Sequence, residues 1–161
     1  MAAVGLLVLR LTLAVVLFAH GAHTLFGMWA GPGVGPGGLS NAAVRLTNLG
    51  LEPGFPIAAL TGFIQVAGAL LLGLGWLTRW AAAAVLLRVL IDVWIIYRPA
   101  GFFLNWTNDP MRGHGMEYAV LIAAALLCLL LTGAGDISFD SRRARRLGKR
   151  ASERERLRRR L

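Results

Sequence analysis

The segment LRLTLAVVLFAHGAHTLFGMW, residues Leu9–Trp29, is apolar enough to lie in lipid, yet it contains Arg10, His20 and His23. A helix needs about 20 apolar residues, each rising about 1.5 Å, to cross about 30 Å of hydrocarbon. The apolar run Val4–Phe26 meets that length. Because Arg10 interrupts this long run and no Lys or Arg precedes it, we expect a retained membrane helix rather than a cleaved signal peptide.

Three further apolar windows predict an all-α, integral membrane four-helix bundle. They are Pro56–Trp76, Trp80–Tyr97 and Tyr118–Thr132. The last two are short for a span, which tilt or local thinning of the bilayer can accommodate at modest cost. The lipid bilayer is therefore the first expected partner of the chain.

Positive charge is concentrated at the C-terminal end. Of the 161 residues, 57% are hydrophobic and 16% charged, against about 25% charged in a typical soluble domain. Residues 136–161 hold eleven Lys and Arg and four Asp and Glu, and so seven of the nine net positive charges. We expect a transmembrane domain over residues 1–135 and a basic cytoplasmic tail over residues 136–161. The basic tail marks the cytoplasmic side, and four spans return the N-terminus to that side.

A short surface helix is expected in the first outer loop, residues 27–55. Ser40 or Asn41 can cap its start, and Gly50 ends it. Its apolar face should cover the outer end of the bundle through Ala43, Leu46 and Leu49.

Cys128 is the only cysteine, so neither an intrachain disulfide nor a Cys-x-x-Cys pair can form. Its apolar neighbours predict a buried, inert thiol. Any redox chemistry therefore needs a bound cofactor or a partner.

Ionisable and amide side chains recur at similar depth in the predicted spans. By helical rise, His20 and Asp92 lie about 8–9 Å from the outer ends of their helices, and Gln65 lies about 14 Å in. A charge facing lipid costs at least about 2.5–3.5 kcal/mol at mid-membrane, so these groups should face inward. We expect a ligand-binding pocket in the outer half of the bundle, formed by His20, His23, Gln65, Arg88, Asp92, Trp106 and Glu117.

Two alternatives limit what this pocket can be. Arg88 and Asp92 are spaced i, i+4, so they can also form a local ion pair that only neutralises itself. His20 and His23 share one side of their helix, but two ligands are too few for a closed zinc site, and we expect no metal. The spacing of the polar residues indicates no nucleophile–base pair, so no catalytic residue is assigned. Arg10 should extend its side chain to cytoplasmic headgroups.

The tail is expected to hold the topology and to bind anionic lipid headgroups, at about 1 kcal/mol per basic residue near the surface. The residues concerned are Arg142, Arg143, Arg145, Arg146, Lys149 and Arg150. Nucleic acid is not an expected partner, because only Phe139 accompanies these side chains and no aromatic residue interleaves them.

Five segments taken in order resemble the DoxX family of small bacterial membrane proteins. They are FAHGAHTLFG (18–27), GFIQVAGALLLGLGWLTRWAA (62–82), GFFLNW (101–106), HGMEYAVLIAAALL (114–127) and GAGDISFD (133–140). The resemblance implies a four-helix protein of the bacterial cytoplasmic (inner) membrane. The related DoxD proteins are subunits of a thiosulfate:quinone oxidoreductase, and other members are tied to quinone or thiol stress.

This sequence departs from the family pattern at three positions. Thr24 stands where many relatives carry Lys, Gln65 where Glu is commoner, and Arg98 where His often precedes Gly-Phe-Phe. If Lys and Glu form a pair in relatives, this chain has replaced both with neutral groups.

Two functional hypotheses follow. The first is an accessory or quinone-associated subunit in redox or oxidative-stress homeostasis, working with a soluble or membrane oxidoreductase and not an enzyme on its own. The second is a non-catalytic membrane scaffold whose basic tail recruits acidic partners or anionic lipid.

Overall fold

The computed structural model describes residues 1–31, 35–107 and 113–159, and the described chain is all-helical with no strand. Three helices are long and apolar enough to cross a membrane: Ala2–Phe26, Gly54–Leu74 and Thr78–Ala100. The first two are α1 and α3; the third is α4 (Thr78–Asp92), continued by the π-helical turn η1 (Val93–Tyr97) and the 3-10 turn η2 (Arg98–Ala100). Helix α5 (Glu117–Thr132) is apolar but has only 16 residues. The prediction of long apolar helices is therefore confirmed for three of the four apolar windows.

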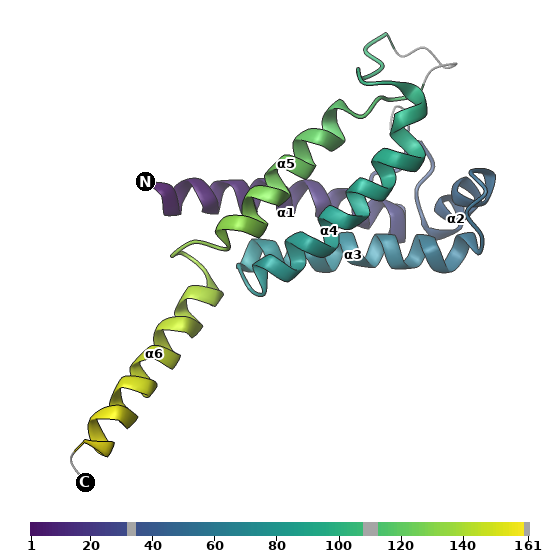
Figure 1. The fold of residues 1–161 in the computed structure, drawn as a ribbon. Coiled ribbons are helices and arrows are strands. Elements are labelled where there is room, and N and C mark those ends of the chain that lie inside the picture. The colour runs from purple at the N-terminus through teal and green to yellow at the C-terminus, as the bar shows by residue number, and fades with distance from the viewer. Residues whose placement is uncertain (32–34, 108–112, 160–161) are drawn as a thin grey trace.

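The helices form two crossed pairs. Helices α1 and α3 lie side by side, and α4 and α5 run diagonally across them (Figure 1). Chain direction alternates along the bundle. One end carries the N-terminus, the α3–α4 turn and the end of α5, while the other carries the end of α1, the short helix α2 (Leu39–Asn48) and the loop after η2.

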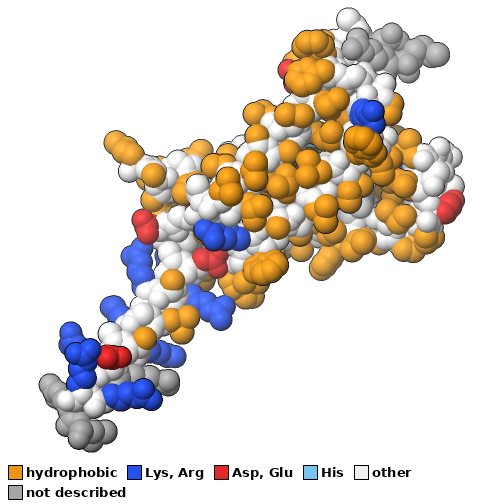
Figure 2. Space-filling view, in the orientation of Figure 1, with side chains coloured by type: hydrophobic (Ala, Val, Ile, Leu, Met, Phe, Trp, Pro, Cys, Tyr) orange, Lys and Arg blue, Asp and Glu red, His pale blue; other side chains and the backbone are white. Residues whose placement is uncertain are grey.

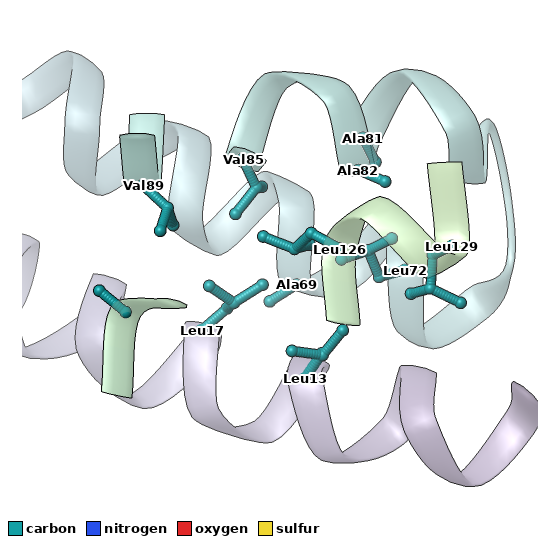
Figure 3. Packing of buried hydrophobic residues seen from close by; sticks show 11 residues of the cluster. Leu13, Leu17, Ala69, Leu72, Ala81, Ala82, Val85, Val89, Leu126 and Leu129 are labelled. Carbon is teal, nitrogen blue, oxygen red and sulfur yellow. The ribbon is translucent and has the colours of Figure 1, made fainter. Parts of the chain in front are cut away.

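The core lies where the two pairs cross. Side chains from α1, α3, α4 and α5 point toward one another there, among them Leu13, Leu17, Ala69, Leu72, Val85, Leu126 and Leu129 (Figure 3). Two glycines allow the close approach of neighbouring helices. A Cβ on Gly68 of α3 would collide with Val85 of α4, and one on Gly21 of α1 would lie 2.9 Å from the Cβ of Gln65. Gly21 thus brings α1 onto α3 beside the predicted polar cluster.

Helix α2 differs from the expectation at its start and in its buried face. It follows Gly38, not Ser40 or Asn41, and no side chain caps it. Gly38 has φ 92° and donates its N–H to the carbonyl of His23, so the end of α1 fixes the start of α2. Ala43 is buried as expected, Leu46 is half-buried and Leu49 is exposed.

Arg10 does not extend to headgroups as expected. It is 1% exposed and donates from Nη1 to the carbonyl of Ala134 and from Nη2 to the carbonyl of Ile137 at 3.0 Å. The reason is local: α5 ends at Thr132, and the carbonyls that follow need donors that no helix supplies. A guanidinium with its five N–H groups meets that need inside the bundle.

The tail forms helix α6 (Phe139–Arg158), which is fixed to the bundle at its first turn. The carboxylate of Asp140 accepts the backbone N–H of Leu77 at 2.9 Å and that of Thr78 at 3.0 Å. It therefore satisfies free donors at the start of α4, where a carboxylate is favourable. Beyond this point α6 extends away from the bundle, and the Lys and Arg side chains gather along it (Figure 2).

Cys128 is exposed on the surface of α5, contrary to the expectation that it is buried. Leu126 and Leu129 occupy the core face of this helix. The helical turn between them rotates Cys128 away from the core.

Candidate functional site

Five predicted polar residues from three helices line one cavity. Its volume is about 280 Å³, and its polar lining includes His20 and His23 of α1, Gln65 of α3, and Arg88 and Asp92 of α4. A smaller recess of about 40 Å³ adjoins it, because His20, Gln65, Arg88 and Asp92 line both spaces. The structure thus brings these residues together between α1, α3 and α4.

Arg88 and Asp92 form an ion pair one helical turn apart. Nη2 of Arg88 lies 2.7 Å from Oδ2 of Asp92, and the side chains are 22% and 12% exposed. Pairing in such surroundings offsets much of the cost of removing both charges from water. Arg88 and Asp92 therefore form the local ion pair that their i, i+4 spacing allowed, and both residues also line the predicted pocket.

Each histidine in the cavity has one ring nitrogen engaged. Nδ1 of His20 lies 2.9 Å from the carbonyl of Val16, and Nδ1 of His23 lies 3.0 Å from the carbonyl of Met28. A carbonyl only accepts hydrogen bonds, so Nδ1 carries the hydrogen in both contacts. In the neutral ring Nε2 is then an acceptor, and on protonation it becomes a donor. The two rings are oriented by different carbonyls, and no group of three His, Cys, Asp or Glu among the described residues could hold a metal ion.

Gln65 is the most deeply buried polar residue of the cavity. It is 3% exposed, and its Oε1 has no hydrogen-bond partner among the described residues. Nε of Arg88, on the facing helix, is also buried and has no hydrogen-bond partner in the described part of the chain. An unpaired buried polar atom costs about 1–3 kcal/mol. Such costs are retained in natural proteins mainly where a function needs them.

Two tyrosines that were not predicted as site residues also line the site. Tyr97 borders both the cavity and the recess, and Tyr118 borders the recess. Tyr97 lies five residues after Asp92, a spacing that ordinary α-helical periodicity does not place on one face. The π-helical turn η1 changes that spacing, since its bonds join residues five apart.

Tyr118 packs on His20, with ring centroids 6.2 Å apart and planes inclined by 22°. In the sequence, the signal that could have identified Tyr118 as a site residue was its position directly after the candidate residue Glu117. Arg45 of α2 is a further cavity residue that was not predicted from the sequence, and it lies on the α2 side of the cavity.

Trp106 and Glu117 lie outside this cavity. Both line a separate groove on α5, together with Tyr118. Oε2 of Glu117 accepts the backbone N–H of Leu104 at 3.3 Å, and Trp106 is 77% exposed. The carboxylate of Glu117 therefore holds the loop that follows η2 against the start of α5.

The six candidate residues of the tail all lie on α6 and are exposed. Arg142 stands over the ring of Phe139, with Cζ 5.8 Å from the centroid, and Arg145 pairs with Asp136 at 3.3 Å. Both contacts are at the solvent-exposed surface, where ion pairs contribute about 1 kcal/mol or less.

The fold and the cavity define a small helical membrane protein with a polar site between α1, α2, α3 and α4 that is open to the surface at His20. The DoxX family model matches residues 5–98, and the chain belongs to the DoxX family. The matched range includes all of α2, α3 and α4, α1 except its first three residues, and every cavity residue on these helices. No curated protein and no solved structure matches the chain.

Proposed function

We propose that the chain binds the ring of a quinone-like amphiphile in the polar cavity, as an accessory subunit in redox homeostasis. The observation that carries the proposal is the meeting of His20, Gln65 and the Arg88–Asp92 pair around one space of about 280 Å³. That volume is just below the usual range of small-molecule sites, about 300–1,000 Å³. It suits a single substituted ring rather than a whole membrane-soluble molecule.

The cavity residues match the polar groups of such a ring. The hydroxyl of Tyr97 and the guanidinium of Arg88 can donate to a ring oxygen, while Nε2 of neutral His20 can accept from a ring hydroxyl. His20 and Asp92 can also take up a proton when the ring loses one. These residues supply no electrons, so the electrons must come from the ligand or from an oxidoreductase partner.

Ligand titration tests this proposal. Purified protein is titrated with the quinol form of a ubiquinone that carries one isoprene unit, because a ring hydroxyl can donate to Nε2 of neutral His20. The variants His20→Ala and His114→Ala are titrated in the same way. Loss of the hydrogen bond at His20 should weaken binding by about tenfold, which corresponds to about 1.4 kcal/mol. His114 is exposed in the outer loop and outside the cavity, so its variant should bind like the parent. Equal binding by all three proteins, or binding by none, would contradict the proposal.

The proposed setting is the bacterial cytoplasmic membrane, with four spans and both termini in the cytoplasm. Support comes from α5, which is short but contributes Ala119, Leu126 and Leu129 to the same core as the longer helices. A second support is the gathering of Lys and Arg on α6, beyond one end of the bundle. Reporter fusions after Leu161 test the orientation: green fluorescent protein should be fluorescent there and alkaline phosphatase inactive. The reverse pattern would contradict it.

A second candidate function, a membrane scaffold acting through its tail, is favoured by the attachment of α6. Asp140 fixes this helix to α4, so its basic side chains are presented from a defined point on the bundle. We propose that they engage anionic headgroups. A fluorophore on Ser152→Cys, with Cys128→Ala, should be shielded from a soluble quencher in phosphatidylglycerol nanodiscs and not in phosphatidylcholine nanodiscs. Equal quenching in both would contradict the proposed lipid contact.

A further inference from the structure

We propose that the groove on α5 binds the apolar tail of the amphiphile whose ring occupies the polar cavity, with Tyr118 between the two sites. The inference rests on the proposed function and adds a second subsite to it. The groove has a volume of about 500 Å³. Its lining consists of Leu104, Trp106, Glu117, Tyr118, Val120, Leu121 and Ala124.

Tyr118 makes the groove and the cavity neighbours. The ring of Tyr118 packs on His20, and Tyr118 lines the recess that adjoins the cavity. The same residue lines the groove on the outer side of α5. The recess beside His20 and the groove on α5 therefore both border Tyr118.

The contact between Tyr118 and His20 can yield to a ligand. The two rings meet by stacking, and no hydrogen bond within the described residues holds the hydroxyl of Tyr118. A side-chain rotation would exchange this ring contact for contact with the ligand. Rotations of that kind need no change in the backbone of α5.

The volumes and linings of the cavity and the groove indicate why the apolar tail of the ligand would need the groove. The cavity has room for a ring, and its polar lining is unfavourable for a hydrocarbon chain. The groove is lined mainly by apolar and aromatic side chains and is charged only at Glu117, at the start of α5. A molecule with a polar ring and an apolar tail would match both surfaces at once.

A second apolar groove provides the comparison. It lies between α1 and α3, has a volume of about 490 Å³, and is lined by Ala14, Val15, Phe18, Ala19, Trp29, Ala69, Leu70, Gly73 and Leu74. It is as large as the groove on α5 but shares no residue with the cavity. Apolar character alone therefore does not select the tail site; contact with the cavity through Tyr118 does.

The test compares two ligands that differ only in their tail. The first is 2,3-dimethoxy-5-methyl-1,4-benzoquinone, and the second carries the same ring with a decyl chain. Ala124→Phe fills the groove on α5, and the matched control Ala19→Phe fills the groove between α1 and α3. Affinities are compared with the parent protein in the same detergent, so that partition of the decyl chain into micelles cancels.

The parent should bind the decyl ligand at least tenfold more tightly than the bare ring. Ala124→Phe should remove this advantage while binding the bare ring within twofold of the parent, and Ala19→Phe should keep it. If Ala124→Phe does not fold, Leu121→Trp serves, because Leu121 is 68% exposed in the same groove.

Other results would overturn the inference in distinguishable ways. Binding of the bare ring without any gain from the decyl chain would leave the proposed function intact and remove the tail site. If Ala19→Phe also loses the tighter binding of the decyl ligand, the assignment of the apolar tail to the groove on α5 would be overturned. A phospholipid that co-purifies with the parent and is lost in Ala124→Phe, with no gain from the decyl chain, would make the groove a lipid site instead. If neither ligand binds the parent, both proposals fail together.

Discussion

Replacing Gln65 with Leu should stabilise the bundle while weakening ligand binding. Gln65 is 3% exposed and its Oε1 has no hydrogen-bond partner among the described residues. An unsatisfied buried carbonyl costs about 1–3 kcal/mol, and Leu fills a similar volume without that cost. A gain of about 2 kcal/mol corresponds to a rise in Tm of about 4–8 °C for a chain of this size.

The assay is thermal unfolding of purified protein in one detergent, with Thr61→Val as the matched control. Thr61 lies one turn earlier on α3 and borders the same cavity, but its hydroxyl donates to the carbonyl of Ala58 at 3.0 Å. Its variant should stay within about 0.5 kcal/mol of the parent. If Gln65→Leu unfolds at a lower temperature, or no higher than Thr61→Val, the amide is satisfied in the bundle and the reasoning about the site is refuted.

Three further substitutions test the packing described above. Arg10→Met should lower the free energy of unfolding by about 2–4 kcal/mol, because two carbonyls of the α5–α6 connection lose their donors; an unchanged unfolding curve would contradict the burial of Arg10. Asp140→Ala should cost about 1–2 kcal/mol and speed tryptic cleavage of α6, with Asp140→Asn intermediate, and equal cleavage rates would argue against the cap. Gly68→Ala should cost about 1–3 kcal/mol because its methyl group meets Val85. Gly5→Ala, whose methyl group would meet no other packed residue within 4 Å, should instead be neutral or stabilise the helix by up to about 1 kcal/mol.

The sequence was informative about the membrane helices for a simple physical reason. A hydrocarbon environment requires long apolar runs, and α1 and α3 begin and end within two residues of the runs that predicted them. The same environment disfavours a polar group that faces lipid. That constraint was enough to group His20, Gln65 and Asp92 before their geometry was known.

Other features depend on contacts that periodicity does not encode. Arg10 finds its acceptors in a segment 124 and 127 residues later in the chain, and only the folded bundle brings them together. Tyr97 joins the cavity because the helix changes to a π turn after Asp92, an irregularity with no sequence signal. Glu117 was predicted to line the polar pocket but holds the loop before α5 instead, because the path of that loop was not predictable.

The cap that Asp140 provides has a mechanical consequence. Helix α4 is held at its first residues by the tail and carries Arg88 and Asp92 at its other end. A displacement of α6 at this attachment would act on the start of α4, a helix of 15 residues whose other end forms part of the cavity wall. The C-terminal extension and the polar cavity are thus connected through a single helix.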